Sequence, residues 1–500
     1  MTAIGLGLLA AIAGFAFPAP LLAIINQDIG PSADISWVSL TYTLTIAVGL
    51  TLIGGTTDIF LGRRYIFIGG GVLGTVGSIV CARADSVNTL IGDMTLIGLA
   101  ASTRVSYFYV VAELVPMKYR FAANSLMYIF TTPGRAFAPA IGESLVRTTS
   151  AGWRGVFYVL IAINAVVLLC FTLFYWPPTF QEKHDSQRKW AYVRQFDYFG
   201  TLLFVSALAL FLMGLSWGGS RYPWLSSYVV ATIVVGGLSF IAFILWEWYG
   251  PTRQPLVPMR MLRDLQWTAA VITSGLGSSL YYGLAIVWPS MVSLIYASGN
   301  SVPDSLLSSL VGAGCIATLA IAGILFACVA TCTVDSHDRA CWLVAFGTFF
   351  AGWVEGLSLP TTTLALGDQD ELGTGCGFGD SIRFSITTVV TAIYNVIITT
   401  RSLPPEAIQT LIAALSAGQA PTTVVGVTPG LGARALQAFK EANIQAYRTV
   451  FFSTIAVTGL GLVATLLLPD VDSLMSEEAT VTLSRTKHPP SMARKTHRTT

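Results

Sequence analysis

The sequence predicts an all-α, polytopic membrane protein. Charged residues make up only 11% of the 500 residues, against roughly 25% in a soluble domain. Apolar residues reach 54%, and long uncharged runs recur, each close to the roughly 20 residues that a bilayer-spanning helix needs. Trp217, Trp224, Trp246 and Trp248 lie at the ends of such runs, as interfacial tryptophans do in membrane proteins.

We predict thirteen spans in three blocks. Residues 1–176 form a first bundle of six helices, residues 177–266 a polar cytoplasmic link with two extra helices, and residues 267–469 a second bundle. The predicted spans are Leu6–Ile25, Trp37–Thr57, Tyr65–Ala82, Leu90–Val111, Phe121–Val146, Gly155–Trp176, Phe199–Trp217, Tyr228–Trp248, Thr268–Val292, Leu306–Thr331, Ala340–Leu366, Gly373–Thr400 and Thr449–Leu468.

The basic residues in the loops between the spans predict how the chain is oriented in the membrane. The loops on one side hold eleven Lys and Arg up to Arg263, whereas those on the other side hold four. This bias places the amino terminus in the cytoplasm. Residues 401–448 are expected to form a long, partly ordered external loop, and the basic tail 470–500 is expected to be disordered.

Composition and motifs argue against several function classes. The net charge of +2 gives no support for a nucleic-acid partner, and the seven cysteines show neither a disulfide framework nor metal-ligand spacing. We see no Ser/His/Asp set, no metal-ligand cluster and no phosphate loop. The sequence therefore predicts a protein that is not an enzyme and that needs no cofactor or metal.

The loop after the second predicted span carries a cluster of charges and glycines. Asp58 falls at the end of that span, and Gly62, Arg63 and Arg64 open the next one. The carboxylate and the arginines could latch two helix ends in one conformation and release them in another. The alternative is an ordinary basic cytoplasmic loop. The pattern resembles the signature of the major facilitator superfamily, with Leu61 as one additional residue before the Gly-Arg-Arg.

Further stretches narrow the resemblance. They are Ser86–Gly92, Glu113–Lys118, Gly152–Gly155, Tyr175–Phe180, Gly214–Gly219, Pro255–Met259, Gly352–Glu355, Gly379–Arg383 and Ala446–Phe451. In this order, from about Asp28 to Leu468, they resemble the fungal trichothecene efflux pump branch of that superfamily, which is close to the fungal siderophore transporters.

The resemblance implies two six-helix bundles with two extra helices between them, working by alternating access. It implies a monomer in the plasma membrane, or else the vacuolar membrane, that exports a small, largely apolar toxin, drug or secondary metabolite against proton influx. A siderophore transporter of the same branch is one alternative. A membrane protein that does not transport is another.

One span of the family pattern is missing. The resemblance implies two helices between Trp288-Pro289 and Cys341-Trp342, but only Leu306–Thr331 fills that interval. An odd count would put the basic tail outside, against the positive-inside bias. Either Leu306–Thr331 does not cross fully, which leaves twelve spans, or the chain comes from a decayed or mis-spliced gene.

The fifth predicted span contains Gly134, Arg135, Ala138, Pro139 and Gly142, which resemble the antiporter motif of the superfamily. Small residues four apart allow close helix contact, and proline bends a helix. The alternative is a packing kink without a role in coupling.

Ionisable residues inside spans are the candidate proton and substrate pathway, because each is costly in a membrane without a partner. Glu355 and Arg383 have opposite sign, and Tyr394 shares the helix face of Arg383. Asp93 and Arg104 lie on one face of the fourth span, too far apart to pair. We expect Glu355 to carry a proton beside Arg383; a static ion pair between two helices is the alternative.

Overall fold

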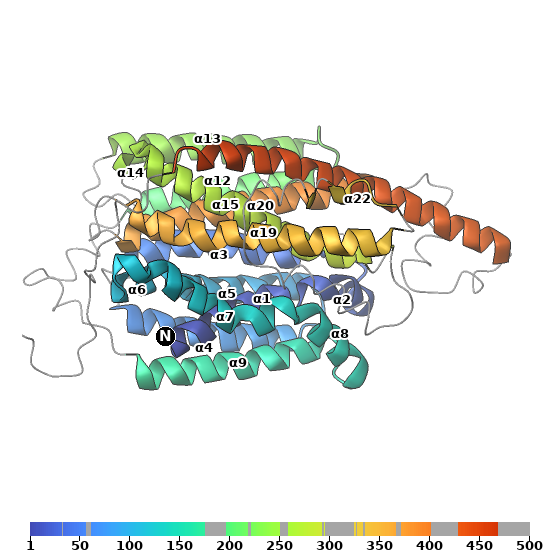
Figure 1. Cartoon of the computed structure of the whole chain (residues 1–500), viewed down its shortest axis with the longest axis horizontal. Helices are drawn as coiled ribbons and strands as arrows, with labels where there is room; N and C mark the ends of the chain where they lie inside the picture. Colours follow the sequence, from blue (N-terminus) through green and yellow to red (C-terminus); the bar gives the residue numbers. More distant parts are fainter. Residues whose placement is uncertain are drawn as a thin grey trace, which may run out of the picture.

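The computed structural model describes residues 1–32, 34–56, 62–175, 197–218, 222–250, 259–292, 295, 325–326, 328–333, 336–366, 372–401 and 429–468. These residues fold almost entirely into long helices that lie side by side (Figure 1), which confirms the predicted all-α class. Several helices begin at a side chain that accepts a hydrogen bond from the first turn, as helix starts require. Ser86, Asp197, Ser226 and Asp264 act in this way.

The first bundle contains the helices up to residue 174. They are α1 (Thr2–Ala16), η1 (Ala19–Leu21), α2 (Leu22–Ile29), α3 (Trp37–Thr56), α4 (Gly62–Ala82), α5 (Val87–Val105), α6 (Tyr107–Leu114), η3 (Met117–Tyr119), α7 (Arg120–Ala136), α8 (Ala138–Thr148) and α9 (Arg154–Phe174).

Two helices follow, and then the second bundle. The pair is α12 (Tyr198–Trp217) and α13 (Ser227–Tyr249). The remaining described helices are α14 (Met259–Arg263), α15 (Leu265–Met291), α19 (His337–Leu364), α20 (Leu372–Arg401) and α22 (Pro429–Thr465).

Eleven helices of the described chain are long and apolar enough to cross a membrane, and each corresponds to a predicted span. The predicted span Phe121–Val146 is present as two shorter helices, α7 and α8, which meet at Phe137. The predicted span Leu306–Thr331 lies largely outside the described residues.

The last helix differs from its prediction. We expected a loop up to residue 448, but α22 already begins at Pro429 and has 37 residues. Its Ala, Leu, Lys and Glu residues favour helix, and after Gly432 the next helix-breaking residue is Gly459. At 1.5 Å per residue the helix is about 55 Å long, and Figure 1 shows its first part projecting beyond the other helices. Residues 402–428 and the predicted tail lie outside the described residues.

Neighbouring helices fix the direction of the second bundle. α15 and α20 run parallel, because Trp267 stacks on Phe378 near their starts and Gly283 lies against Tyr394 further along. α19 runs in the opposite sense, because Glu355 contacts Ser278 in the middle of α15, whereas Leu366, just after α19, and Met261, just before α15, both lie against Gly375. The end of α15 and the start of α19 therefore lie at the same end of the molecule (Figure 1). The end of α22 lies at the end of the molecule where α1 begins, hereafter the Met1 end (Figure 1). The side of the basic tail stays a prediction, because the tail lies outside the described residues.

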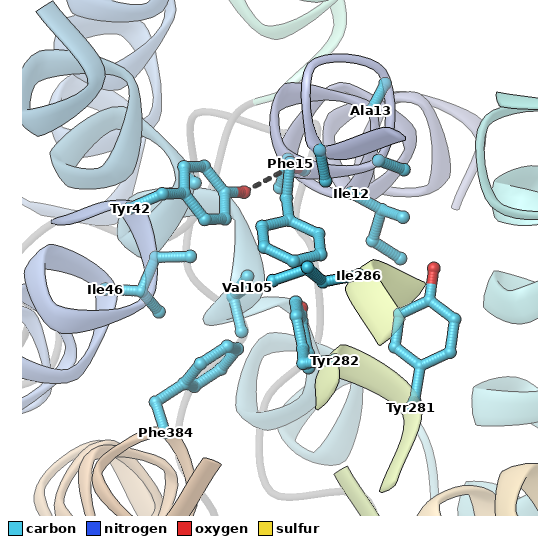
Figure 2. Packing of buried hydrophobic residues seen from close by; sticks show 14 of the residues in the cluster. Ile12, Ala13, Phe15, Tyr42, Ile46, Val105, Tyr281, Tyr282, Ile286 and Phe384 are labelled. Atoms are coloured by element: carbon cyan, nitrogen blue, oxygen red, sulfur yellow. Dashed lines mark hydrogen bonds between the residues drawn. The ribbon is translucent and has the colours of Figure 1, made fainter. Parts of the chain in front are cut away.

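The two bundles meet along η1, α3, α6 and α7 on one side and α15, α19 and α20 on the other. Aromatic rings fill part of this interface (Figure 2). Phe15 packs between Tyr42 and Tyr282, at centroid distances of 5.7 and 5.0 Å. Tyr282 in turn contacts Phe384 at 5.5 Å. The extra pair lies outside this interface, with α12 against α3 and α20 and α13 against α12.

Candidate functional site

A small cavity of about 20 Å³ lies between the two bundles, with room for about one water molecule. Both bundles line it, and three of its lining residues are charged: Arg135, Glu355 and Arg383. All three side chains are less than a tenth exposed. Buried charges of this kind mark a functional site in a membrane protein unless they only stabilise the fold.

Glu355 on α19 connects two arginines. Its Oε2 lies 2.6 Å from Nη2 of Arg135 on α7, and its Oε1 lies 3.0 Å from Nη1 of Arg383 on α20. Ser278 on α15 donates a hydrogen bond to Oε1 at 3.2 Å. The structure thus brings Glu355 and Arg383 together as an ion pair, as we expected, and adds Arg135 as a second partner.

Asp380 completes the charged cluster. Its Oδ1 lies 2.7 Å from Nε of Arg383, and its side chain is 3% exposed. The four side chains therefore carry two positive and two negative charges when all are ionised. This balance lets the cluster stay buried, since a lone ion there would be far more costly.

The cluster is framed by aromatic rings. The guanidinium of Arg135 lies 3.8 Å from the ring centroid of Tyr281, and that of Arg383 lies 4.5 Å from Phe384. Such cation–π contacts stabilise a cation that has left water. Tyr107 and Tyr128 also line the cavity.

The antiporter-like motif positions Arg135. α7 packs on α1, where a Cβ at Gly134 would lie only 2.7 Å from Cδ1 of Leu9. The helix then breaks at Phe137, and Pro139 sits in the first turn of α8. Ala138 is fully buried, and Gly142 faces Leu21. The motif therefore acts at least as a close contact that fixes where Arg135 enters the cavity; its role in coupling stays a prediction.

Two further contacts join the bundles toward the Met1 end. In the glycine seam, between α3 and α20, a Cβ at Gly377 would lie 2.5 Å from Cα of Gly54, and Ser381 donates a hydrogen bond to the carbonyl of Ala47.

The polar seam, between α7 and α19, consists of three contacts. Arg120 Nη1 donates to the Thr363 carbonyl at 3.2 Å, Asn124 Nδ2 donates to the Gly356 carbonyl at 3.0 Å, and Arg135 pairs with Glu355. Tyr107 holds Asn124 by donating to its Oδ1 at 2.7 Å.

Other predicted site residues lie elsewhere. Arg104 is buried inside the first bundle, where its Nη2 donates to the Gly70 carbonyl at 3.3 Å. Asp93 is 8% exposed on the same helix, and its Oδ2 accepts no hydrogen bond from the described residues. No contact joins the two among these residues, as expected from their spacing. Tyr394 packs against α15 at Gly283 and does not line the cavity.

Only part of the predicted latch belongs to the residues that the structure describes. Asp58 lies outside the described residues, and the Arg63 side chain is likewise not described. Gly62 begins α4, and Arg64 donates from Nη2 to the Thr172 carbonyl of α9 at 2.7 Å. The latch therefore remains a prediction.

Asp380, Ser278 and the tyrosines of α15 were not predicted as site residues from the sequence. Asp380 had a readable signal, because it precedes Arg383 by three residues and such pairs share a helix face. Ser278 and Tyr281 gave none, since uncharged residues in a long apolar helix look alike until the packing is known.

Comparison with known proteins shows which family the chain resembles. The family of fungal trichothecene efflux pumps matches residues 2–353. A trichothecene efflux pump of Trichoderma arundinaceum is 31% identical over 357 residues, which cover 70% of this chain and 57% of that protein. One of Fusarium sporotrichioides is 25% identical over 497 residues, 91% of this chain and 82% of that protein. This chain thus spans little more than half of the first relative.

Among solved structures, a bacterial homologue of the human lysosomal transporter Spinster, in an inward-facing and unoccupied conformation, matches with a TM-score of 0.55. It is 11% identical, and the match covers 95% of this chain and 98% of that one. At this identity the likeness concerns the fold alone.

Proposed function

The chain belongs to the fungal trichothecene efflux pump family of the major facilitator superfamily, and on that premise we propose that it is a secondary active exporter. Its substrates are small, largely apolar compounds, and proton influx drives their export by alternating access. The Met1 end faces the cytoplasm, as the distribution of Lys and Arg favours. The protein resides in the plasma membrane, as the family resemblance implies.

The observation that supports this proposal is the buried bond between Arg135 and Glu355. Arg135 belongs to the first bundle and Glu355 to the second, so the bond holds the bundles together at the cavity. Alternating access requires the bundles to rock against each other around that cavity. The bond must therefore be released in every cycle.

A proton on Glu355 provides such a release. A neutral carboxyl group no longer attracts Arg135 as an ion, whereas Arg383 keeps Asp380 as a counter-charge. A substrate that takes the place of Glu355 beside Arg135 would release the same bond. The carrier then stays closed while it holds neither a proton nor a substrate, and binding of either one lets it reorient. A carrier of this kind exchanges substrate for protons across the membrane.

Glu355→Gln tests this mechanism. Purified protein in liposomes should move a radiolabelled trichothecene against its concentration gradient when a pH gradient is imposed. The variant should lose this accumulation at least about tenfold, because a glutamine amide cannot take up the proton, while downhill exchange of the compound continues. Glu143→Gln serves as the matched control, since Glu143 forms an exposed ion pair with Arg147 on α8.

Unchanged pH-driven accumulation in Glu355→Gln would show that the ion pair is static. A loss of accumulation that is equally large in Glu143→Gln would also count against Glu355 as the carrier.

A further inference from the structure

The turn before α19 brings two cysteines to one end of the molecule. The described residues that precede this turn, 325–326 and 328–333, include short helical stretches. They pack against α19, because a Cβ at Gly347 would lie 2.6 Å from Cε1 of Phe326. Cys332 follows Phe326 by six residues, and Cys341 precedes Gly347 by six residues. Positions at equal distance from a contact face each other across an antiparallel hairpin, so Cys332 and Cys341 lie opposite one another.

Hydrogen bonds within the turn keep its two ends together. The Thr333 amide donates to Oγ of Ser336 at 2.6 Å, and the Ser336 amide donates to the Thr333 carbonyl at 3.2 Å. Cys332 and Cys341, on either side of these bonds, lie near enough to interact electrostatically. The spacing of the cysteines along the sequence did not reveal this pair, because it depends on the register of the hairpin.

The Cys341 thiol is placed to act as a nucleophile. A helical side chain leans toward the start of its helix, and Sγ of Cys341 accordingly lies 3.9 Å from Nε2 and 4.0 Å from Nδ1 of His337. Oδ1 of Asp338 lies 3.1 Å from Nδ1 of the same histidine. A thiol beside a base that a third group orients is an activated nucleophile. Cys341 is also partly exposed, whereas Cys332 is buried.

This pair of thiols lies at the end of the molecule opposite the Met1 end (Figure 1). In the orientation proposed above, that end faces the outside of the cell, where disulfides form and persist, whereas the cytosol keeps thiols reduced. Among the described residues no three His, Cys, Asp or Glu side chains are placed to hold a metal ion together. The chemistry available to the pair is therefore that of two thiols.

We propose that Cys341 and Cys332 form a thiol–disulfide exchange site for small disulfides outside the cell. His337 takes the proton of Cys341, and the thiolate attacks one sulfur of the external disulfide. The sulfur–sulfur bond of that disulfide breaks, and its first half leaves and takes up the proton as a thiol. Cys332 then gives up its own proton and attacks Sγ of Cys341, which expels the second half as a thiol. The external disulfide has been reduced to two thiols, and the chain has gained a bond between Cys332 and Cys341.

This bond ties the residues before the turn to α19, the helix that bears Glu355. The inference rests on the proposed orientation of the chain, and it does not depend on which compound is transported.

Oxidised glutathione tests the site in the purified full chain. After incubation, free thiols are alkylated with N-ethylmaleimide and the protein is cut with trypsin, which cleaves after Arg339, between the two cysteines. Compared with protein kept in reduced glutathione, the oxidised sample should lose two alkylated thiols and show the two cysteine peptides joined. Cys332→Ser should stop the reaction midway, with one glutathione left on Cys341.

Two further variants examine the roles of single residues. His337→Gln should slow the reaction at least about tenfold, because the thiol loses its base. Cys328→Ser is the matched control, since this cysteine lies in the same segment about one helical turn before Cys332, and it should behave like wild type.

The proposal is overturned if oxidised glutathione leaves both cysteines open to alkylation, or if the joined peptide contains Cys328 instead of Cys341. If Cys332→Ser does not fold, the wild-type peptide map decides alone. In intact cells kept reduced, a maleimide that cannot cross the membrane should label Cys341. Labelling only after permeabilisation would overturn the external oxidant together with the orientation. Absence of pH-driven transport in liposomes would remove the exporter function and leave the result on the thiols standing.

Discussion

The glycine seam and the polar seam join the same two bundles by different means. At the glycine seam α3 and α20 touch almost backbone to backbone at Gly54 and Gly377. At the polar seam α7 and α19 are connected by side chains of Arg120, Asn124 and Arg135. The first contact depends on shape and has no titratable group among these residues, whereas the second ends in a carboxylate that a proton can neutralise. We infer that one seam sets how closely the bundles close and the other sets when they open.

The largest effect should follow from the loss of Arg383, which supports Glu355 at the end of the polar seam. Arg383→Gln leaves Glu355 with Arg135 and takes the arginine from Asp380, and breaking a buried pair on one side costs about 3–5 kcal/mol. We expect a clearly lower melting temperature of the purified protein in detergent. Arg383→Gln combined with Asp380→Asn restores the charge balance and should recover a large part of that loss. An unchanged melting temperature in the single variant would contradict the charge balance described for the cluster.

The glycine seam should respond to a single methyl group. Gly377→Ala places a Cβ 2.5 Å from Cα of Gly54, and overpacking of this kind costs about 1–3 kcal/mol. The Met1 end should close less often, which would appear as faster labelling of cysteines introduced at that end and slower transport. Gly356→Ala is the matched control, because a Cβ there meets nothing within 4 Å. Equal labelling rates in the two variants would show that close approach at Gly377 does not matter.

A further prediction concerns a neutral hydrogen bond of the polar seam, and its effect on transport should be the smallest of the three. Asn124→Ala removes the donor to the Gly356 carbonyl and the acceptor of Tyr107. Such a loss costs about 1–3 kcal/mol when a buried group is left unsatisfied. A modest drop in melting temperature with retained proton coupling is expected. Loss of coupling in Asn124→Ala would mean that the two seams cannot be separated by function as proposed.

Most of the fold could be predicted from the sequence because lipid imposes a simple rule of length and polarity. The run Gly155–Trp176 became α9, from Arg154 to Phe174, since nothing in it interrupts an apolar helix. The rule is weaker where a helix breaks inside the membrane, as at Phe137, and where polar residues prolong a helix beyond it, as in the first part of α22. The relative directions of α15 and α19 could not be derived from the sequence, because counting apolar runs does not show at which end of the molecule two helices meet.

Of the candidate site, only charged residues could be predicted from the sequence. Glu355 and Arg383 stand out in apolar spans, and their opposite signs suggest a pair. Arg135 shares the same carboxylate only because the two bundles bring together residues that are 220 positions apart in sequence. No local sequence pattern records such a contact. Arg104 illustrates the converse, since an equally conspicuous arginine proves to lie within one bundle, on the Gly70 carbonyl.

The placement of α12 has a mechanical consequence. This helix touches α3 of the first bundle and α20 of the second, so it must slip along at least one of them whenever the bundles rock. Its partner α13 presents most of its surface outward, with only 17% of the residues in its most apolar stretch buried. If the bundles rock as proposed, the lipid around this pair must adjust to each movement. Bilayer thickness and lateral pressure would then affect the turnover rate, alongside the chemistry inside the cavity.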